Sequence, residues 1–161
     1  MAEKKWLVFW GINIMKIIKQ YETSTLIQIE QLHDELVNRF DYADNIFNLY
    51  IDKLHFEYGN NYEKCKLSFL GFENIFCDIS ITFMKLRKNK IRNGKKFYLD
   101  EFLRYIKKRK FFFEILDIYF GYGKVLIVGK TTDCRIHFGN IIHLTIDSKF
   151  VKFEFINSSH Q

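Results

Sequence analysis

The sequence lacks the residues that usually separate domains. It has 161 residues with no proline, only eight glycines and no serine-rich or glycine-rich tract. Flexible linkers depend on such tracts, so their absence predicts a single domain over residues 1–161. This length is enough for an independent hydrophobic core, because a chain of about 150 residues buries roughly 70% of its unfolded surface.

Cysteine is scarce as well, and no disulfide framework is expected. Cys65, Cys77 and Cys134 are odd in number and widely spaced, and no Cys-x-x-Cys pair occurs. Such cysteines are typical of reduced thiols in a cytoplasmic protein, because free cysteine behaves as a small hydrophobic residue.

No apolar run is long enough to form a transmembrane segment. The main candidate extends from Trp6 to Met15 and is followed by Lys16 and Lys19, whereas a membrane-spanning helix needs about 20 apolar residues. No small-x-small cleavage site follows the run, which also argues against a signal peptide. We therefore expect a cytoplasmic protein without a transmembrane segment.

Hydrophobic periodicity predicts two helices in the N-terminal part. Apolar residues between Trp6 and Tyr21 recur at helical spacing, with further apolar residues on the other faces. A second set begins after Thr25 and Gln28, which have capping-box spacing, and ends at Phe40. We expect a buried first helix and an amphipathic second helix.

From about Asn48 the period changes to two, which is typical of strands. One further helix is predicted from Leu99 to Ile106, where helical spacing returns. The sequence therefore predicts an α+β domain, with an antiparallel sheet of about seven strands, two N-terminal helices and one mid-chain helix. The candidate strands are residues 54–58, 65–69, 75–83, 111–120, 124–128, 135–138, 141–146 and 150–156.

Positive charge is concentrated between residues 85 and 110. This basic segment has twelve cationic residues against Asp100 and Glu101, which leaves 13 basic and 17 acidic residues elsewhere. Together with Phe111–Phe113 it could bind single-stranded nucleic acid through phosphate contacts and stacking, or be a solvated surface. Its cations are Lys85, Arg87, Lys88, Lys90, Arg92, Lys95, Lys96, Arg104, Lys107, Lys108, Arg109 and Lys110.

A second charged surface is acidic. Residues 30–57 contain seven carboxylates against Arg39 and Lys53, a net charge of −5. If a helix continues to residue 41, its acidic residues lie along one edge, where they can imitate a phosphate backbone or remain simply solvated. The predicted acidic face comprises Glu30, Asp34, Asp41 and Asp44.

Catalytic and metal-binding signals are weak. His137 and His143 could meet on neighbouring strands, and with Lys130 or Lys149 they would supply the groups of an RNA-cleaving site. Their spacing is equally typical of partly exposed strand residues. Cys134 and His137 have metal-ligand spacing, but no second pair completes a tetrahedral set. We expect no metal and no cofactor.

In general character the chain resembles the small bacterial immunity proteins that neutralise contact-delivered or polymorphic toxins. The resemblance rests on its short length, the lack of a catalytic motif and the opposed charges of residues 30–57 and 85–110. It implies a non-enzymatic cytoplasmic protein that covers the functional surface of a toxin through complementary charge and aromatic anchors. Members share no single fold, and many that bind nucleases are acidic, whereas this chain has a net charge of +6.

Two other functions fit the same residues. The first is RNA or DNA binding through residues 85–113, and the second is a nuclease activity of His137 and His143. A salt-dependent affinity would distinguish nucleic-acid binding from the immunity function.

Overall fold

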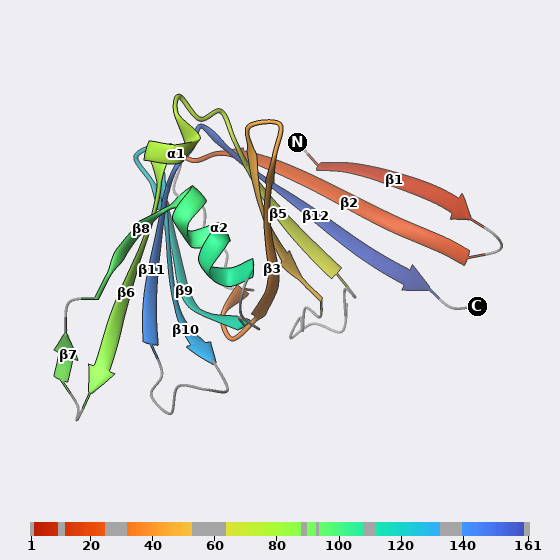
Figure 1. Cartoon of the computed structure of the whole chain (residues 1–161). Coiled ribbons are helices and arrows are strands. Elements are labelled where there is room, and N and C mark those ends of the chain that lie inside the picture. The colour runs from red at the N-terminus through yellow and green to blue at the C-terminus, as the bar shows by residue number, and fades with distance from the viewer. Residues whose placement is uncertain are drawn as a thin grey trace.

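The computed structural model describes residues 2–9, 12–24, 32–52, 64–87, 90–92, 94–107, 112–132 and 140–159. Within these ranges, side chains are described for residues 18–24, 32–52, 64–84, 94–107, 112–131 and 141–155. The described residues form twelve strands and two short helices (Figure 1). The helices are α1 (Ile75–Asp78) and α2 (Leu99–Lys107), and the strands are β1 (Ala2–Phe9), β2 (Ile12–Glu22), β3 (Leu36–Ala43), β4 (Ile46–Ile51), β5 (Lys64–Leu70), β6 (Ile79–Arg87), β7 (Lys90–Arg92), β8 (Lys96–Tyr98), β9 (Phe112–Gly121), β10 (Lys124–Thr132), β11 (Asn140–Asp147) and β12 (Phe150–Ser159).

All twelve strands belong to one antiparallel sheet. Its order is β1-β2-β12-β5-β4-β3-β9-β10-β11-β6-β7, and β8 pairs with β6 outside this path. The sheet curls so that β9, β10, β11 and β6 lie opposite β3, β4, β5 and β12, whereas β1 and β2 extend away from the body (Figure 1). The two halves join where β3 meets β9: Leu36 pairs with Glu114 and Val37 with Phe113, and two backbone hydrogen bonds link residues 34 and 35 to Ile115.

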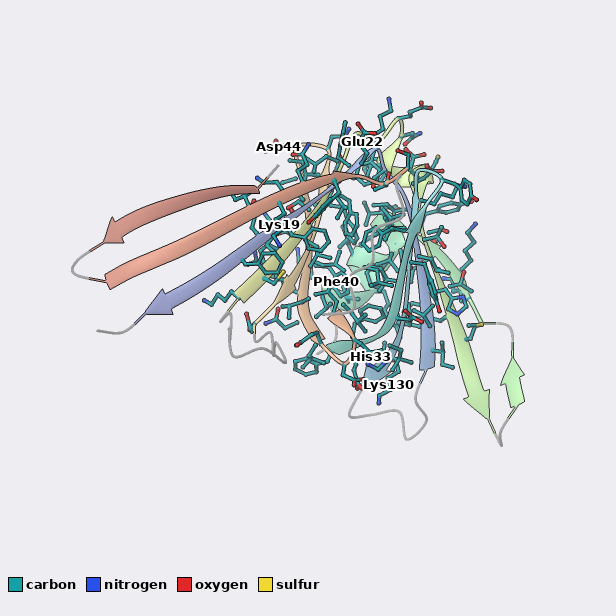
Figure 2. The ribbon with its side chains drawn as sticks, turned by 180° about the vertical axis from the view of Figure 1, so that it is seen from behind. Lys19, Glu22, His33, Phe40, Asp44 and Lys130 are labelled. Carbon is teal, nitrogen blue, oxygen red and sulfur yellow. The ribbon has the colours of Figure 1, made fainter. Side chains whose placement is uncertain are left out.

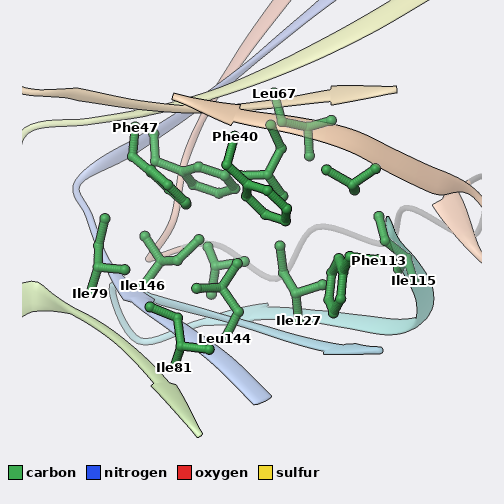
Figure 3. Close-up of a cluster of buried hydrophobic side chains, with 14 of the residues drawn as sticks. Phe40, Phe47, Leu67, Ile79, Ile81, Phe113, Ile115, Ile127, Leu144 and Ile146 are labelled. Carbon is green, nitrogen blue, oxygen red and sulfur yellow. The ribbon is translucent and has the colours of Figure 1, made fainter. Parts of the chain in front are cut away.

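The hydrophobic core lies between the two halves of the curled sheet. Figure 3 shows side chains of β3, β4 and β5 meeting those of β6, β9, β10 and β11. Strand alternation supplies these residues: in β12, for example, Val151, Phe153 and Phe155 are buried. Helix α2 adds Phe102, whose ring centroid lies 5.3 Å from that of Phe40 and 6.3 Å from that of Phe83.

The predicted α+β class is wrong, because the described residues are mostly β with two short helices. The prediction of two N-terminal helices is wrong as well. The first predicted helix is the hairpin of β1 and β2, in which Ala2 pairs with Lys19 and Phe9 with Ile12. Apolar residues on every face of a segment fit a strand as well as a buried helix, and the β-branched isoleucines of residues 12–18 favour the strand.

A β-bulge explains the error in the second predicted helix. Val37 and Phe40 are three residues apart and both buried, which is helical spacing. Strand β3 nevertheless pairs Val37 with Ile51 and Arg39 with Tyr50, so the register shifts by one residue between them. The extra residue turns both side chains to the core and imitates a helical period. The predicted cap at residues 25–28 lies outside the described residues.

The remaining predictions are confirmed in part. The antiparallel sheet is confirmed, and the predicted mid-chain helix is α2. The expected strand number of about seven is wrong, because the described residues form twelve. Ile75–Asp78 is helical, with the Asn74 side chain accepting a hydrogen bond from the Phe76 amide, so that β6 begins only at Ile79. The predicted strands 54–58 and 135–138 lie outside the described residues.

Candidate functional site

Connections that are distant in sequence surround a cleft of about 480 Å³ at one end of the molecule. They follow β2, β5, β9 and β11, and the adjoining turn of α1 completes the wall. We call this feature the acidic cleft. Its lining residues are Glu22, Thr23, Ser24, Gly71, Glu73, Asp78, Gly123, Asp147, Ser148, Lys149 and Phe150.

Backbone hydrogen bonds hold three of these segments together. The Thr23 amide donates to the Lys149 carbonyl at 3.1 Å, and the Lys149 amide donates to the Leu70 carbonyl at 3.0 Å. The Thr23 hydroxyl also donates to the Ser148 carbonyl. The turn between β11 and β12 is therefore fixed to the ends of β2 and β5, and the geometry of the acidic cleft follows from the sheet.

Carboxylates dominate the charge of the acidic cleft, with four against the single lysine Lys149. Asp147 forms a 3.3 Å ion pair with Lys124, and Asp78 accepts a 2.8 Å hydrogen bond from the Asn74 amide. Glu73 has no hydrogen bond or ion pair among the described residues. The lining is net negative and complementary to a cationic group. The four carboxylates are those of Glu22, Glu73, Asp78 and Asp147.

An exposed aromatic residue stands beside the acidic cleft. Tyr122 is 97% exposed in the two-residue turn between β9 and β10, next to the lining residue Gly123. Its φ is +55° and that of Gly123 is +74°, as in a type I′ turn, where Asn, Asp and Gly are preferred. Asp44 and Asn45 occupy the equivalent turn between β3 and β4 with similar φ values. A tyrosine at such a position is unfavourable for stability and contributes no burial.

The predicted acidic face is not a single surface. Asp44 lies at the same end as Glu22, whereas His33 lies at the opposite end beside Lys130 (Figure 2). Asp34 adjoins His33 and pairs with it at 2.9 Å. Glu30 is outside the described residues. Because Leu36–Ala43 is strand β3 and not helix, Asp34 and Asp41 do not share the helix edge expected for them.

Asp41, the remaining member of that face, is engaged in a polar network on the outer side of the sheet. Its carboxylate lies 3.2 Å from the Arg39 guanidinium and accepts a 2.7 Å hydrogen bond from the Asn48 side chain. The guanidinium lies 3.7 Å from the centre of the Tyr50 ring. Burial raises the pKa of Tyr50, and a hydrogen bond to Asp41 raises it further. The Asp41 carboxylate is therefore partly neutralised by Arg39, although its side chain remains 39% exposed.

The basic segment 85–110 is described in part. Lys95, Lys96 and Lys107 are exposed and make no ion pair with other described residues, whereas Arg104 pairs with Asp100 at 2.7 Å. The Lys96 ammonium lies 5.4 Å from the centre of the exposed Tyr98 ring.

The register of the β6–β7 hairpin adds further positive charge to the basic segment. It sets Lys85 opposite Arg92 and Arg87 opposite Lys90. Lys88, Lys108, Arg109 and Lys110 lie outside the described residues.

The predicted catalytic histidines are not brought together by any described contact. His143 is half-buried in β11, where it pairs in register with Val128 and Thr82, and His137 lies outside the described residues. Within the described ranges, no three His, Cys, Asp or Glu side chains gather as a metal ion requires. No helix found there is long and apolar enough to cross a membrane.

The thiols differ strongly in environment. Burial raises the pKa of the Cys65 thiol well above its usual range, and the nearby Glu35 and Glu154 raise it further. Cys77 is exposed on α1. Because the thiolate is the reactive form, Cys65 is unreactive in the native state.

We expect iodoacetamide to modify Cys77 at least about 100-fold faster than Cys65 at pH 8, since Cys65 reacts only after the core opens. Peptide mapping by mass spectrometry measures the two rates separately. The difference should disappear in 6 M guanidinium chloride. Equal rates in the native protein would contradict the buried position of Cys65.

Comparison with protein-family models, curated proteins and solved structures finds no match to this chain. Fold similarity therefore supplies no functional argument, and a proposal must rest on the chemistry of the surfaces.

The sequence did not predict the acidic cleft, because the residues that line it are distant in sequence. Their common signal is that they adjoin turns, such as Gly121–Gly123 and residues 147–149.

Proposed function

We propose that this chain is a cytoplasmic protein-binding module of the immunity or antitoxin type, which performs no chemistry itself. It neutralises a cognate toxin by covering a cationic functional surface of that toxin. The observation that carries the proposal is the acidic cleft, where four carboxylates face one lysine beside a 97% exposed tyrosine. Nuclease active sites present cations to bind phosphates, so they are suitable partners for this surface.

In this proposal the charge of the acidic cleft speeds association, and the Tyr122 ring contributes binding energy. A cleft with one sign of charge can raise an association rate by roughly 10-fold to 1,000-fold at low salt. Tyrosine is enriched among the residues that contribute most to binding energy, because it buries a large area with few rotatable bonds. Tyr122 sits in a turn that disfavours it, which supports a role in binding rather than in stability.

The test uses the protein encoded by the neighbouring toxin gene as the partner. Tyr122→Asn keeps the type I′ turn and removes the ring, and we expect it to weaken the complex about 30-fold. The same change should raise the free energy of unfolding slightly, by about 0.5 kcal/mol, since asparagine tolerates positive φ better. Isothermal titration calorimetry and urea unfolding measure the two effects.

Tyr98→Ala is the matched control, because it removes an exposed tyrosine ring from the basic segment, away from the acidic cleft. Affinity for the toxin should then stay within twofold of the parent. The absence of an adjacent toxin gene, or a toxin that the chain neither binds nor inhibits, would refute the proposal.

Nucleic-acid binding through the basic segment is the second candidate. It is favoured by the exposed Lys96 and Tyr98, whose ammonium and ring centre are 5.4 Å apart. A phosphate backbone could bind the Lys96 ammonium, and a base could stack on Tyr98.

If this candidate is correct, a 15-nucleotide single strand should bind at 20 mM salt, and log affinity should fall with log salt by about 0.7 per phosphate contact. Tyr98→Ala should weaken this binding roughly 5-fold to 100-fold, as expected for one stacked base. Tyr122→Asn then serves as the control. Fluorescence anisotropy that shows no binding to RNA or DNA at 20 mM salt excludes the candidate.

A further inference from the structure

The acidic cleft has an inner end formed by side chains that solvent hardly reaches. Thr23 and Ser148 both line it, although Thr23 is 0% exposed and Ser148 only 3%. The Thr23 hydroxyl is engaged with the Ser148 carbonyl. The Ser148 hydroxyl, by contrast, has no hydrogen-bond partner in the part of the chain that the structure describes. Buried hydroxyls are normally satisfied, so this oxygen is an unused acceptor at the inner end of the acidic cleft.

The carboxylates define the chemistry of that donor. Four of them line the acidic cleft with Lys149, and Lys124 pairs with one of them, Asp147, so the carboxylates still outnumber these lysines by two. The Lys149 stem is held against Gly71, where a Cβ atom on Gly71 would lie only 2.8 Å from the Lys149 Cβ. A neutral or anionic group entering this cleft would leave the negative charge uncompensated, whereas a cation with several N–H donors would neutralise it.

We infer that the acidic cleft receives a single arginine side chain of the protein partner, an inference that rests on the proposed function. A guanidinium group carries five N–H donors in a fixed plane, which suits a site with several carboxylates and an unused hydroxyl. It is also more weakly hydrated than an ammonium group, so it enters an inner end lined by buried residues at lower cost. The volume of about 480 Å³ lies within the range of ordinary ligand pockets.

Binding of N-acetyl-arginine amide to the ¹⁵N-labelled full chain tests this inference by NMR. The amides of Gly71, Gly123 and Ser148 should shift saturably, with a dissociation constant in the millimolar range. N-acetyl-citrulline amide, which has nearly the same shape without the charge, should give no saturable shift. N-acetyl-lysine amide should bind at least about threefold more weakly, because its ammonium cannot form paired contacts.

Ser148→Ala separates a ligand-binding role from a structural one. The substitution should weaken arginine amide binding about fivefold, while the melting temperature stays equal or rises, because an unsatisfied buried hydroxyl is removed. Glu73→Gln should weaken binding about threefold and leave the melting temperature unchanged. A Ser148→Ala protein that binds arginine amide like the parent would overturn the role of the hydroxyl.

The outcomes distinguish this inference from the proposed function. If the toxin binds but arginine amide causes no saturable shift, the inferred arginine site is wrong, while the proposed toxin-binding function is retained. If arginine amide binds but the toxin does not, the immunity function is wrong. Spermidine binding more than 10-fold tighter than arginine amide would identify a free polyamine as the ligand and overturn a partner side chain.

Discussion

Replacing Phe102 with alanine is expected to lower the free energy of unfolding by about 3–5 kcal/mol. Phe102 is buried in α2 and reaches across the open side of the curled sheet, where its ring lies 5.3 Å from that of Phe40 in β3 and 6.3 Å from that of Phe83 in β6. It is therefore the residue through which α2 connects the two halves. Without it, the helix loses its main contact with β3.

The surroundings of Phe102 make full relaxation improbable. Its ring already borders a dry gap too small to hold a water molecule, which is also lined by Phe40, Ile81, Phe113, Ile142 and Leu144. These neighbours come from β3, β6, β9 and β11, strands that hydrogen bonds fix in register. The sheet cannot close over the vacated volume, so the free energy cost of the cavity adds to the cost of the lost apolar burial.

Urea unfolding monitored by far-ultraviolet circular dichroism measures the effect. Leu103→Ala is the matched control on the same helix, because Leu103 is only partly buried, and it should cost about 1–2 kcal/mol. A loss below about 1 kcal/mol for Phe102→Ala would show that α2 does not close the core. Arg104 and Lys107 of the basic segment also lie on α2, so the same experiment tests whether the core holds these two cations in place.

Local patterns predicted β5 and the strands of the C-terminal half, and failed for β1 to β4. After residue 110, strict alternation and the turns at Gly121–Gly123 and 147–149 correctly separate β9, β10, β11 and β12. In β3, the bulge between Val37 and Arg39 produces a false helical period. A bulge depends on the partner strand, so no reading of one segment alone could distinguish it from a helical turn.

The candidate site was harder to predict than the fold. Glu22, Glu73, Asp78 and Asp147 each look like isolated surface acids in the sequence, and only the sheet order brings their turns together. The predicted acidic face failed for the complementary reason. Its residues are close in sequence, but Asp44 and the Asp34 that pairs with His33 lie at opposite ends of the molecule.

The opposed charges that the sequence indicates are therefore distributed differently in the structure. The turns of the acidic cleft and α1 lie at one end of the molecule, and β7 and the end of β6 lie toward the other (Figure 1). A partner with a cationic surface is attracted to the first end and repelled from the second. This separation gives an encounter a preferred orientation, which complements the net charge of +6.

Replacing Gly129 with alanine is expected to destabilise the protein by about 3 kcal/mol or more, the second large effect. A Cβ atom at Gly129 would lie 2.4 Å from the Glu114 carbonyl oxygen and 2.4 Å from a carbon of the Phe113 ring. Both contacts are too close for any side chain, and neither neighbour can move freely. Phe113 is buried in the core, and Glu114 belongs to the neighbouring strand β9.

The register of β10 explains why glycine is needed at this position. The pairing of β10 with β9 shifts between Val128 and Gly129, and the Phe113 ring covers the glycine, which is how aromatic residues often stabilise glycine in sheets. Gly123→Ala is the control, because a Cβ atom at Gly123 meets nothing within 4 Å. Only the φ of +74° opposes this substitution, at a cost of about 1 kcal/mol in the free energy of unfolding.

Thermal unfolding should thus rank the parent as most stable, Gly123→Ala second and Gly129→Ala last. A Gly129→Ala protein as stable as the Gly123→Ala control would mean that β9 and β10 are not paired with this bulge, and that the core around Phe113 is built differently.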